Sequence, residues 1–83
     1  MDDSIDLHTF LPAECGDVVE EFVRDAHERG LTTVRIIHGK GIGNLRRTVH
    51  AVLDRHPAVA RYYQADVNWG ATIVELKLAG AVS

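Results

Sequence analysis

The chain has 83 residues, of which 46% are hydrophobic and 25% charged, and its formal net charge is −3. This length makes one domain, residues 1–83, with room for one sheet face covered by helices, and the composition argues against disorder. The negative charge argues against a protein that coats nucleic acid without specificity. No apolar run approaches the roughly 20 residues of a membrane span. The single cysteine excludes an internal disulfide, so we expect a cytoplasmic protein.

The first half of the chain predicts a strand, a helix and a second strand. Residues 4–8 alternate, with Ile5 and Leu7 on one face, which is typical of a short strand. Apolar residues at helical spacing follow Pro12 and continue to Gly30, a residue type that commonly ends a helix. Residues 33–37 are β-branched enough to form a buried strand.

The second half predicts a helix and two strands. Residues 45–53 place their apolar side chains on one helical face, and Pro57 ends that helix. Residues 59–67 form a strand of mixed polarity, residues 68–70 a turn, and residues 72–78 an alternating final strand. We expect the folded part to span about residues 4–78, with a loose tail at 79–83. The expected core contains Phe22, Val23, Val34, Ile36, Val49, Val52, Leu53, Val74 and Leu76.

The resulting order, β-α-β-α-β-β, places chemically active residues together. A strand-helix-strand crossover makes the first two strands parallel neighbours with a right-handed connection. His8 and His38 leave these strands and therefore emerge at the same edge of the sheet. Because ligands of open α/β sheets bind at this carboxyl edge, we expect a site formed by Asp6, His8 and the loop after His38.

That loop reads His38-Gly39-Lys40-Gly41-Ile42-Gly43-Asn44-Leu45-Arg46 and lies between a strand and a helix. Alternating glycines permit positive φ angles and close approach to a ligand. The helix behind it offers free N–H groups and the positive end of its dipole, an arrangement that binds anions such as phosphate. Basic residues in the first turn oppose the dipole unless an anion lies between them. We therefore favour anion binding over a plain turn, through Gly39, Lys40, Gly41, Gly43, Asn44, Arg46 and Arg47.

Several segments resemble the small MutS-related (Smr) domain family. Ile5-Asp6-Leu7-His8 followed by a helix is similar to its opening motif, and residues 38–46 are similar to its central signature at every defining position. Val59, Tyr62 and Ala65 resemble its third strand and residues 70–74 its last, so the resemblance spans roughly residues 5–78. Two positions depart from the pattern. Thr9 stands where the family usually has glycine, and the last turn is shorter and contains Trp69.

The resemblance implies a two-layer α/β sandwich with a mixed four-stranded sheet and two helices, like the C-terminal domain of a bacterial translation initiation factor. It also implies nucleic-acid binding, with nicking or RNA-cleaving endonuclease activity in several members. The chain is then expected to be a stand-alone Smr-like domain, a monomer or weak oligomer without a membrane partner. Its expected partner is DNA or RNA, either structured or associated with the ribosome.

Phosphodiester cleavage needs an activated nucleophile, stabilised phosphorane charge and a proton for the leaving oxygen. Asp6 and His8 lie two apart on the expected strand and so point the same way. They are candidates for a base with its orienting carboxylate, or for a pair of metal ligands, which leaves a divalent cation open as cofactor. His38 is the candidate acid. Two structural alternatives stay open: Asp6 as a buried carboxylate that ties down loop backbone, and His38 as a brace for the loop.

Other polar residues have simpler interpretations. His27, His50 and His56 are expected on helix surfaces, and Cys15 occupies a core-facing helical position. Trp69 either stacks on an unpaired base or caps the open end of the core. One cysteine without paired ligand spacing argues against a structural zinc site.

Three functions are compatible with these residues. The first is an Smr-type endonuclease acting on DNA or RNA. The second is a non-catalytic module whose glycine loop clamps a nucleic-acid backbone, as the loop of the KH domain does. The third is a protein-interaction domain in which the site is idle. The presence of Asp6, His8 and the full central motif favours the first two.

Overall fold

The computed structural model describes residues 3–39, 44–65 and 70–78. Its order of elements is β1 (Asp3–Asp6), two short 3-10 turns (Leu7–Thr9 and Pro12–Glu14), α1 (Cys15–Glu28), β2 (Thr33–Ile37), α2 (Asn44–Arg55), β3 (Val59–Gln64) and β4 (Ala71–Leu76). The predicted β-α-β-α-β-β order is therefore confirmed.

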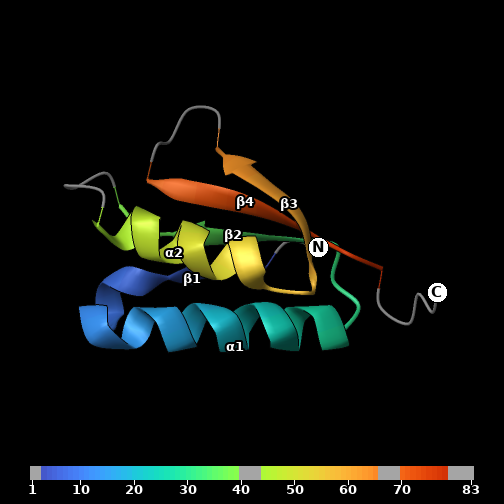
Figure 1. Cartoon of the computed structure of the whole chain (residues 1–83), viewed down its shortest axis with the longest axis horizontal. Coiled ribbons are helices and arrows are strands. Elements are labelled where there is room, and N and C mark those ends of the chain that lie inside the picture. The colour runs from blue at the N-terminus through green and yellow to red at the C-terminus, as the bar shows by residue number, and fades with distance from the viewer. Residues whose placement is uncertain (1–2, 40–43, 66–69, 79–83) are drawn as a thin grey trace.

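The four strands form one mixed sheet with the order β1-β2-β4-β3. β1 runs parallel to β2, whereas β4 is antiparallel to both β2 and β3. α1 and α2 pack against each other and lie side by side over the sheet (Figure 1). This two-layer α/β arrangement agrees with the prediction. No helix among the described residues is long and apolar enough to cross a membrane.

The core lies between the helices and the sheet. Every predicted core residue is buried there except Phe22, which is partly buried and packs against the cluster. Leu7, Cys15, Val19 and Ala26 complete the cluster from the first half of the chain. Burial raises the pKa of the Cys15 thiol, as expected for a cysteine used in packing.

The first helix ends as its sequence predicts. Gly30 has a φ of +80°, and its N–H donates to the carbonyl of His27 while that of Leu31 donates to the carbonyl of Ala26. These two bonds form a Schellman motif, in which the left-handed residue is usually glycine. The helix begins later than expected, because residues 12–14 form a 3-10 turn before α1 starts at Cys15.

Several predicted element ends were wrong. The first strand stops at Asp6 rather than residue 8, because the Asp6 side chain caps the 3-10 turn Leu7–Thr9. β3 ends at Gln64 rather than residue 67, and β4 ends at Leu76, beyond which Leu78 is 69% exposed. The predicted tail and residues 68 and 69 of the predicted turn lie outside the described residues.

The expectation that His50 and His56 lie on helix surfaces was also wrong. His56 follows α2 and is only 8% exposed. Its Nδ1 accepts the Ala58 N–H at 3.1 Å, and its Nε2 lies 3.3 Å from the carbonyl oxygen of Glu20. The ring thus ties the turn between α2 and β3 to α1. His50 is half-buried and belongs to the site described next.

Candidate functional site

Asp6 and His8 form a hydrogen-bonded pair at the end of β1. One carboxylate oxygen of Asp6 accepts the His8 backbone N–H at 2.9 Å and lies 2.7 Å from Nδ1 of the His8 ring. Since a carboxylate only accepts hydrogen bonds, Nδ1 carries the proton and Nε2 of the neutral ring keeps its lone pair. Both side chains remain more than half exposed. The pair is formed by a turn and not, as predicted, by alternation along a strand.

Asp6 is held in its charged form. Its pKa lies below the ordinary value, mainly because the His8 amide donates to the carboxylate. Desolvation opposes this shift, and the His8 ring adds to it. The backbone bond is the same one that caps the 3-10 turn, so the carboxylate has a structural task and orients the imidazole as well.

Gly39 touches the His8 ring, so the ends of β1 and β2 meet as predicted. Asp6 pairs with Ile37 in the parallel register, which places Gly39 near the 3-10 turn. A Cβ built on Gly39 would lie 2.7 Å from Nε2 of His8 and 3.3 Å from its Cε1. Gly39 also has a φ of +84°, in the left-handed region that favours glycine. Both the backbone and the contact therefore require glycine here.

The start of the glycine loop is anchored to the beginning of β4. The backbone N–H groups of His38 and Gly39 both donate to the carbonyl of Gly70, at 2.7 and 2.9 Å. The amide of Gly39 is therefore already used inside the protein. Gly39 serves the site by its lack of a side chain, and its amide does not have the free N–H that the sequence interpretation assigned to phosphate.

The His38 ring is buried, with 3% of the residue exposed. Its Nδ1 lies 3.0 Å from the Gly39 carbonyl oxygen and its Nε2 lies 2.9 Å from the Thr72 hydroxyl. Both ring nitrogens thus have protein partners. Of the two roles that the sequence left open for His38, this geometry matches the brace for the loop rather than an open acid.

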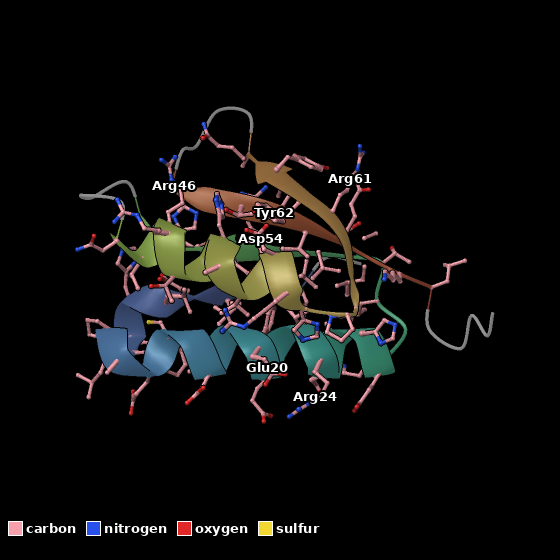
Figure 2. All side chains as sticks on the ribbon, in the orientation of Figure 1. Glu20, Arg24, Arg46, Asp54, Arg61 and Tyr62 are labelled. Carbon is pink, nitrogen blue, oxygen red and sulfur yellow. The ribbon has the colours of Figure 1, made fainter. Side chains whose placement is uncertain are left out.

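Thr72 and His50 were not identified from the sequence. The hydroxyl of Thr72 lies 3.1 Å from Nε2 of His50, which projects from α2. The His50 ring packs on Tyr62 with centroids 4.8 Å apart, and the Tyr62 hydroxyl donates to Asp54 at 2.5 Å. Figure 2 shows this last pair between β3 and α2. Spacing along the chain gives no signal for these contacts, because they join three different elements.

The pKa of His50 is lowered. Burial is the main cause, and the nearby His38 and Arg46 add to it because they disfavour a second positive charge. Asp54 opposes the shift. The His50 ring is therefore kept neutral down to a lower pH than a free histidine.

The first turn of α2 carries three of the residues predicted for anion binding. Asn44, Arg46 and Arg47 are exposed there, and Arg46 donates to the side-chain oxygen of Gln64 on β3 at 3.4 Å. Figure 2 shows Arg46 at this end of the helix. The remaining predicted binding residues, Lys40, Gly41, Gly43 and Trp69, lie outside the described residues.

Thr9, which replaces the usual glycine, fits its position without strain. Its backbone is not in the left-handed region, and its hydroxyl donates to the Asp6 carbonyl at 3.4 Å. Within residues 3–39, 44–65 and 70–78, no three His, Cys, Asp or Glu side chains are grouped closely enough to hold a metal ion.

Comparison with known proteins decides the family. The sequence model of the Smr domain family matches residues 5–77. The chain belongs to the Smr domain family. This domain is 36% identical over 80 residues to Endonuclease MutS2 of Clostridium botulinum and 39% identical over 77 residues to Endonuclease MutS2 of Clostridium novyi. These alignments cover 93% and 89% of this chain but only 10% of each relative, so the Smr domain spans about a tenth of these proteins.

Solved structures of Smr domains have the same fold. The Smr domain of Thermus thermophilus MutS2 matches with a TM-score of 0.84 and 32% identity, covering 90% of this chain and 98% of that one. YdaL, a stand-alone small MutS-related protein from Escherichia coli, matches with a TM-score of 0.77 and 32% identity, covering 89% of this chain and 63% of that one. The fold implied by the sequence motifs is therefore confirmed.

Proposed function

We propose that this Smr domain is a nucleic-acid endonuclease whose general base is His8. The observation that carries the proposal is the exposed Asp6–His8 pair, in which the carboxylate holds Nδ1 at 2.7 Å and leaves the lone pair of the neutral ring on Nε2, beside Gly39. A carboxylate that orients an imidazole and stabilises its protonated form is a recurrent arrangement for activating a nucleophile. The pair lies at the carboxyl edge of the parallel strands, where ligands of α/β sheets bind.

In the proposed reaction, Nε2 of His8 removes a proton from the attacking hydroxyl, which is water or, in RNA, a ribose hydroxyl. The oxygen attacks phosphorus, and the bond to the leaving oxygen breaks. Asp6 stays ionised and stabilises the imidazolium that forms. The arginines at the start of α2, Arg46 and Arg47, hold the phosphate and offset its charge. We assign no acid role to His38, because both of its ring nitrogens already have partners. A water molecule gives its proton to the leaving oxygen, and the hydroxide that remains takes the proton from the His8 imidazolium, which restores the neutral ring.

The relatives support a nucleic-acid substrate and a cleavage reaction. Two proteins that share 36% and 39% identity with this chain bear the name Endonuclease MutS2. Most of their length lies outside the shared domain, so their names support the reaction class and no particular substrate. DNA and RNA are both candidates, and the proposed reaction accommodates either one.

A nicking assay tests the proposal. Purified protein is incubated with supercoiled plasmid and with end-labelled RNA, each with Mg²⁺ and with a chelator, and binding is measured in parallel by fluorescence anisotropy. We expect Asp6→Asn and His8→Ala to lower the cleavage rate by roughly 10²–10⁴-fold while binding changes little. His27→Ala is the control, because His27 lies at the far end of α1 from the 3-10 turn.

The outcomes separate the three functions. Cleavage by the parent protein that survives both substitutions would remove His8 as the base. Binding without cleavage under any condition would make the domain a nucleic-acid clamp. Absence of both binding and cleavage would favour a protein-interaction domain. If Asp6→Asn lowers thermal stability and binding together, with the rate per bound complex unchanged, Asp6 is a structural anchor only.

A further inference from the structure

One buried hydroxyl joins two histidines behind the glycine loop. Thr72 on β4 is 1% exposed, and its hydroxyl oxygen lies 2.9 Å from Nε2 of His38 and 3.1 Å from Nε2 of His50. The two imidazoles come from different elements, since His38 follows β2 and His50 lies on α2. The hydroxyl therefore links the loop to the helix that the loop precedes.

The positions of the protons in this chain of hydrogen bonds follow from the partners. The carbonyl of Gly39 can only accept, so Nδ1 of His38 carries a hydrogen and Nε2 of the neutral ring must accept. Thr72 has one hydroxyl hydrogen, and it is given to His38. The Thr72 oxygen then accepts from His50, so Nε2 of His50 carries the hydrogen. Each ring is thus fixed in one tautomer, and the two tautomers differ.

We propose that Thr72 and His50 are positioning residues of the nucleic-acid site and set the orientation of the His8 ring through His38 and Gly39. Thr72 and His50 hold His38 in the Nδ1–H tautomer, and that N–H fixes the Gly39 carbonyl. Gly39 in turn lies against His8. The catalytic role of this series of hydrogen bonds rests on the proposed function. The order of donors and acceptors in the series does not depend on that function.

The same series of hydrogen bonds connects the loop to the cationic end of α2. His50 lies one helical turn after Arg46, and its ring packs on Tyr62. The Tyr62 hydroxyl is hydrogen-bonded to Asp54, which lies one turn further along α2. Arg46 reaches β3 through Gln64. A displacement of α2 relative to the sheet would therefore disturb the His50–Thr72 bond. The catalytic pair and the proposed phosphate contacts are thereby kept in a fixed relation.

Nitrogen-15 NMR of the histidine rings tests the proposal without any nucleic acid. Spectra of the whole chain are recorded at about pH 8, where imidazoles with ordinary pKa values near 6.5 are neutral. We expect the hydrogen of His38 on Nδ1 and that of His50 on Nε2. A parent spectrum with the hydrogen of His38 on Nε2 would overturn the proposal, whatever the variants do.

Substitution of Thr72 supplies the functional arm. Thr72→Val keeps the shape and removes the hydroxyl, so we expect His38 to lose its fixed tautomer, the His8 ring signals to move, and the cleavage rate at saturating substrate to fall about three- to tenfold. Thr72→Ser restores the hydroxyl and is expected to rescue all three. Thr33→Val, in the neighbouring strand β2, is the control because Thr33 forms no part of this chain of bonds.

The failures of this proposal and of the proposed function are distinguishable. If Thr72→Val leaves the His38 tautomer, the His8 signals and the rate unchanged, the positioning role is refuted. Should Thr72→Val not fold, His50→Phe, which keeps a ring beside Tyr62 but lacks the donor, must shift the His38 and His8 signals. Predicted tautomers in a protein that neither binds nor cleaves nucleic acid would refute the proposed function and leave the hydrogen-bond order intact.

Discussion

Replacement of Gly39 by alanine tests how closely the glycine loop controls the His8 ring. The new Cβ would lie 2.7 Å from Nε2, far inside ordinary contact distance, so one of the two groups must move. The His8 ring is exposed and forms the flexible side of this contact, whereas both amides at the start of the loop are bonded to the Gly70 carbonyl. We therefore expect the ring to move and its 2.7 Å bond to Asp6 to weaken.

The magnitude follows from two separate costs. Alanine in the left-handed conformation at a φ of +84° costs about 1–2 kcal/mol of folding stability. Displacement of the ring adds little to that cost, because the histidine is exposed, but it changes the geometry of the base. Misplacement of a catalytic group by about 1 Å can lower a rate roughly 10²-fold. We expect Gly39→Ala to cleave about 10- to 100-fold more slowly, with nucleic-acid affinity nearly unchanged.

Gly30→Ala is the matched control. Gly30 has nearly the same conformation, with a φ of +80°, but a Cβ there would meet nothing within 4 Å. Both variants should therefore lose similar stability in urea denaturation, and only Gly39→Ala should lose cleavage. If both variants kept the parental rate after the same loss of stability, the contact between Gly39 and His8 would have no role in the reaction.

Three further predictions concern the core, the charges and the pH. Truncation of Leu53, which is 2% exposed, to alanine should lower the free energy of unfolding by about 2–5 kcal/mol, whereas truncation of the exposed Leu78 should lower it little. Denaturation midpoints of the two variants test this difference. Arg46→Ala should weaken binding to duplex DNA and reduce the slope of log K against log salt concentration by about 0.9 in magnitude, and Lys77→Ala should do neither. Anisotropy titrations at several salt concentrations measure both quantities. Because the folded pKa of His50 is lowered, the unfolded chain binds that proton more tightly. Stability should therefore fall as pH drops below 6.5 toward the folded value, and His50→Phe should remove this part of the dependence in urea midpoints.

The fold was predictable because its elements carry clear patterns. The alternation in residues 71–76 and the β-branched run at 33–37 correspond to the two central strands. Element ends were less predictable, because a single side chain decided them. The Asp6 carboxylate accepts the N–H of His8 and so turns the chain at Asp6. The strand therefore ends two residues before the end at residue 8 that its alternation predicts. Such a cap competes locally with the strand, and hydrophobic periodicity does not report it.

The outer part of the site was predictable, but the buried part was not. The parallel crossover alone requires the ends of β1 and β2 to meet, and the contact between His8 and Gly39 follows from it. The chain of bonds through Thr72 depends on which side chains of β4 and α2 face each other across the core. A histidine on a helix is polar and is assigned to the surface by default. His50 is instead stabilised by a hydroxyl 22 residues away and by the ring of Tyr62.

The contacts of Gly39 change the meaning of the first glycine in the loop. Its N–H donates to Gly70, its carbonyl accepts from His38, and its Cα faces the His8 ring. Both of its backbone polar groups are thus engaged within the protein, so this glycine serves close packing between the loop and the His8 ring. The residues proposed here to hold the phosphate, Arg46 and Arg47, are exposed in the first turn of α2. The contact with the proposed base, His8, is therefore made at the start of the loop, and the proposed phosphate contacts are made in the helix after it. A displacement of α2 should alter both.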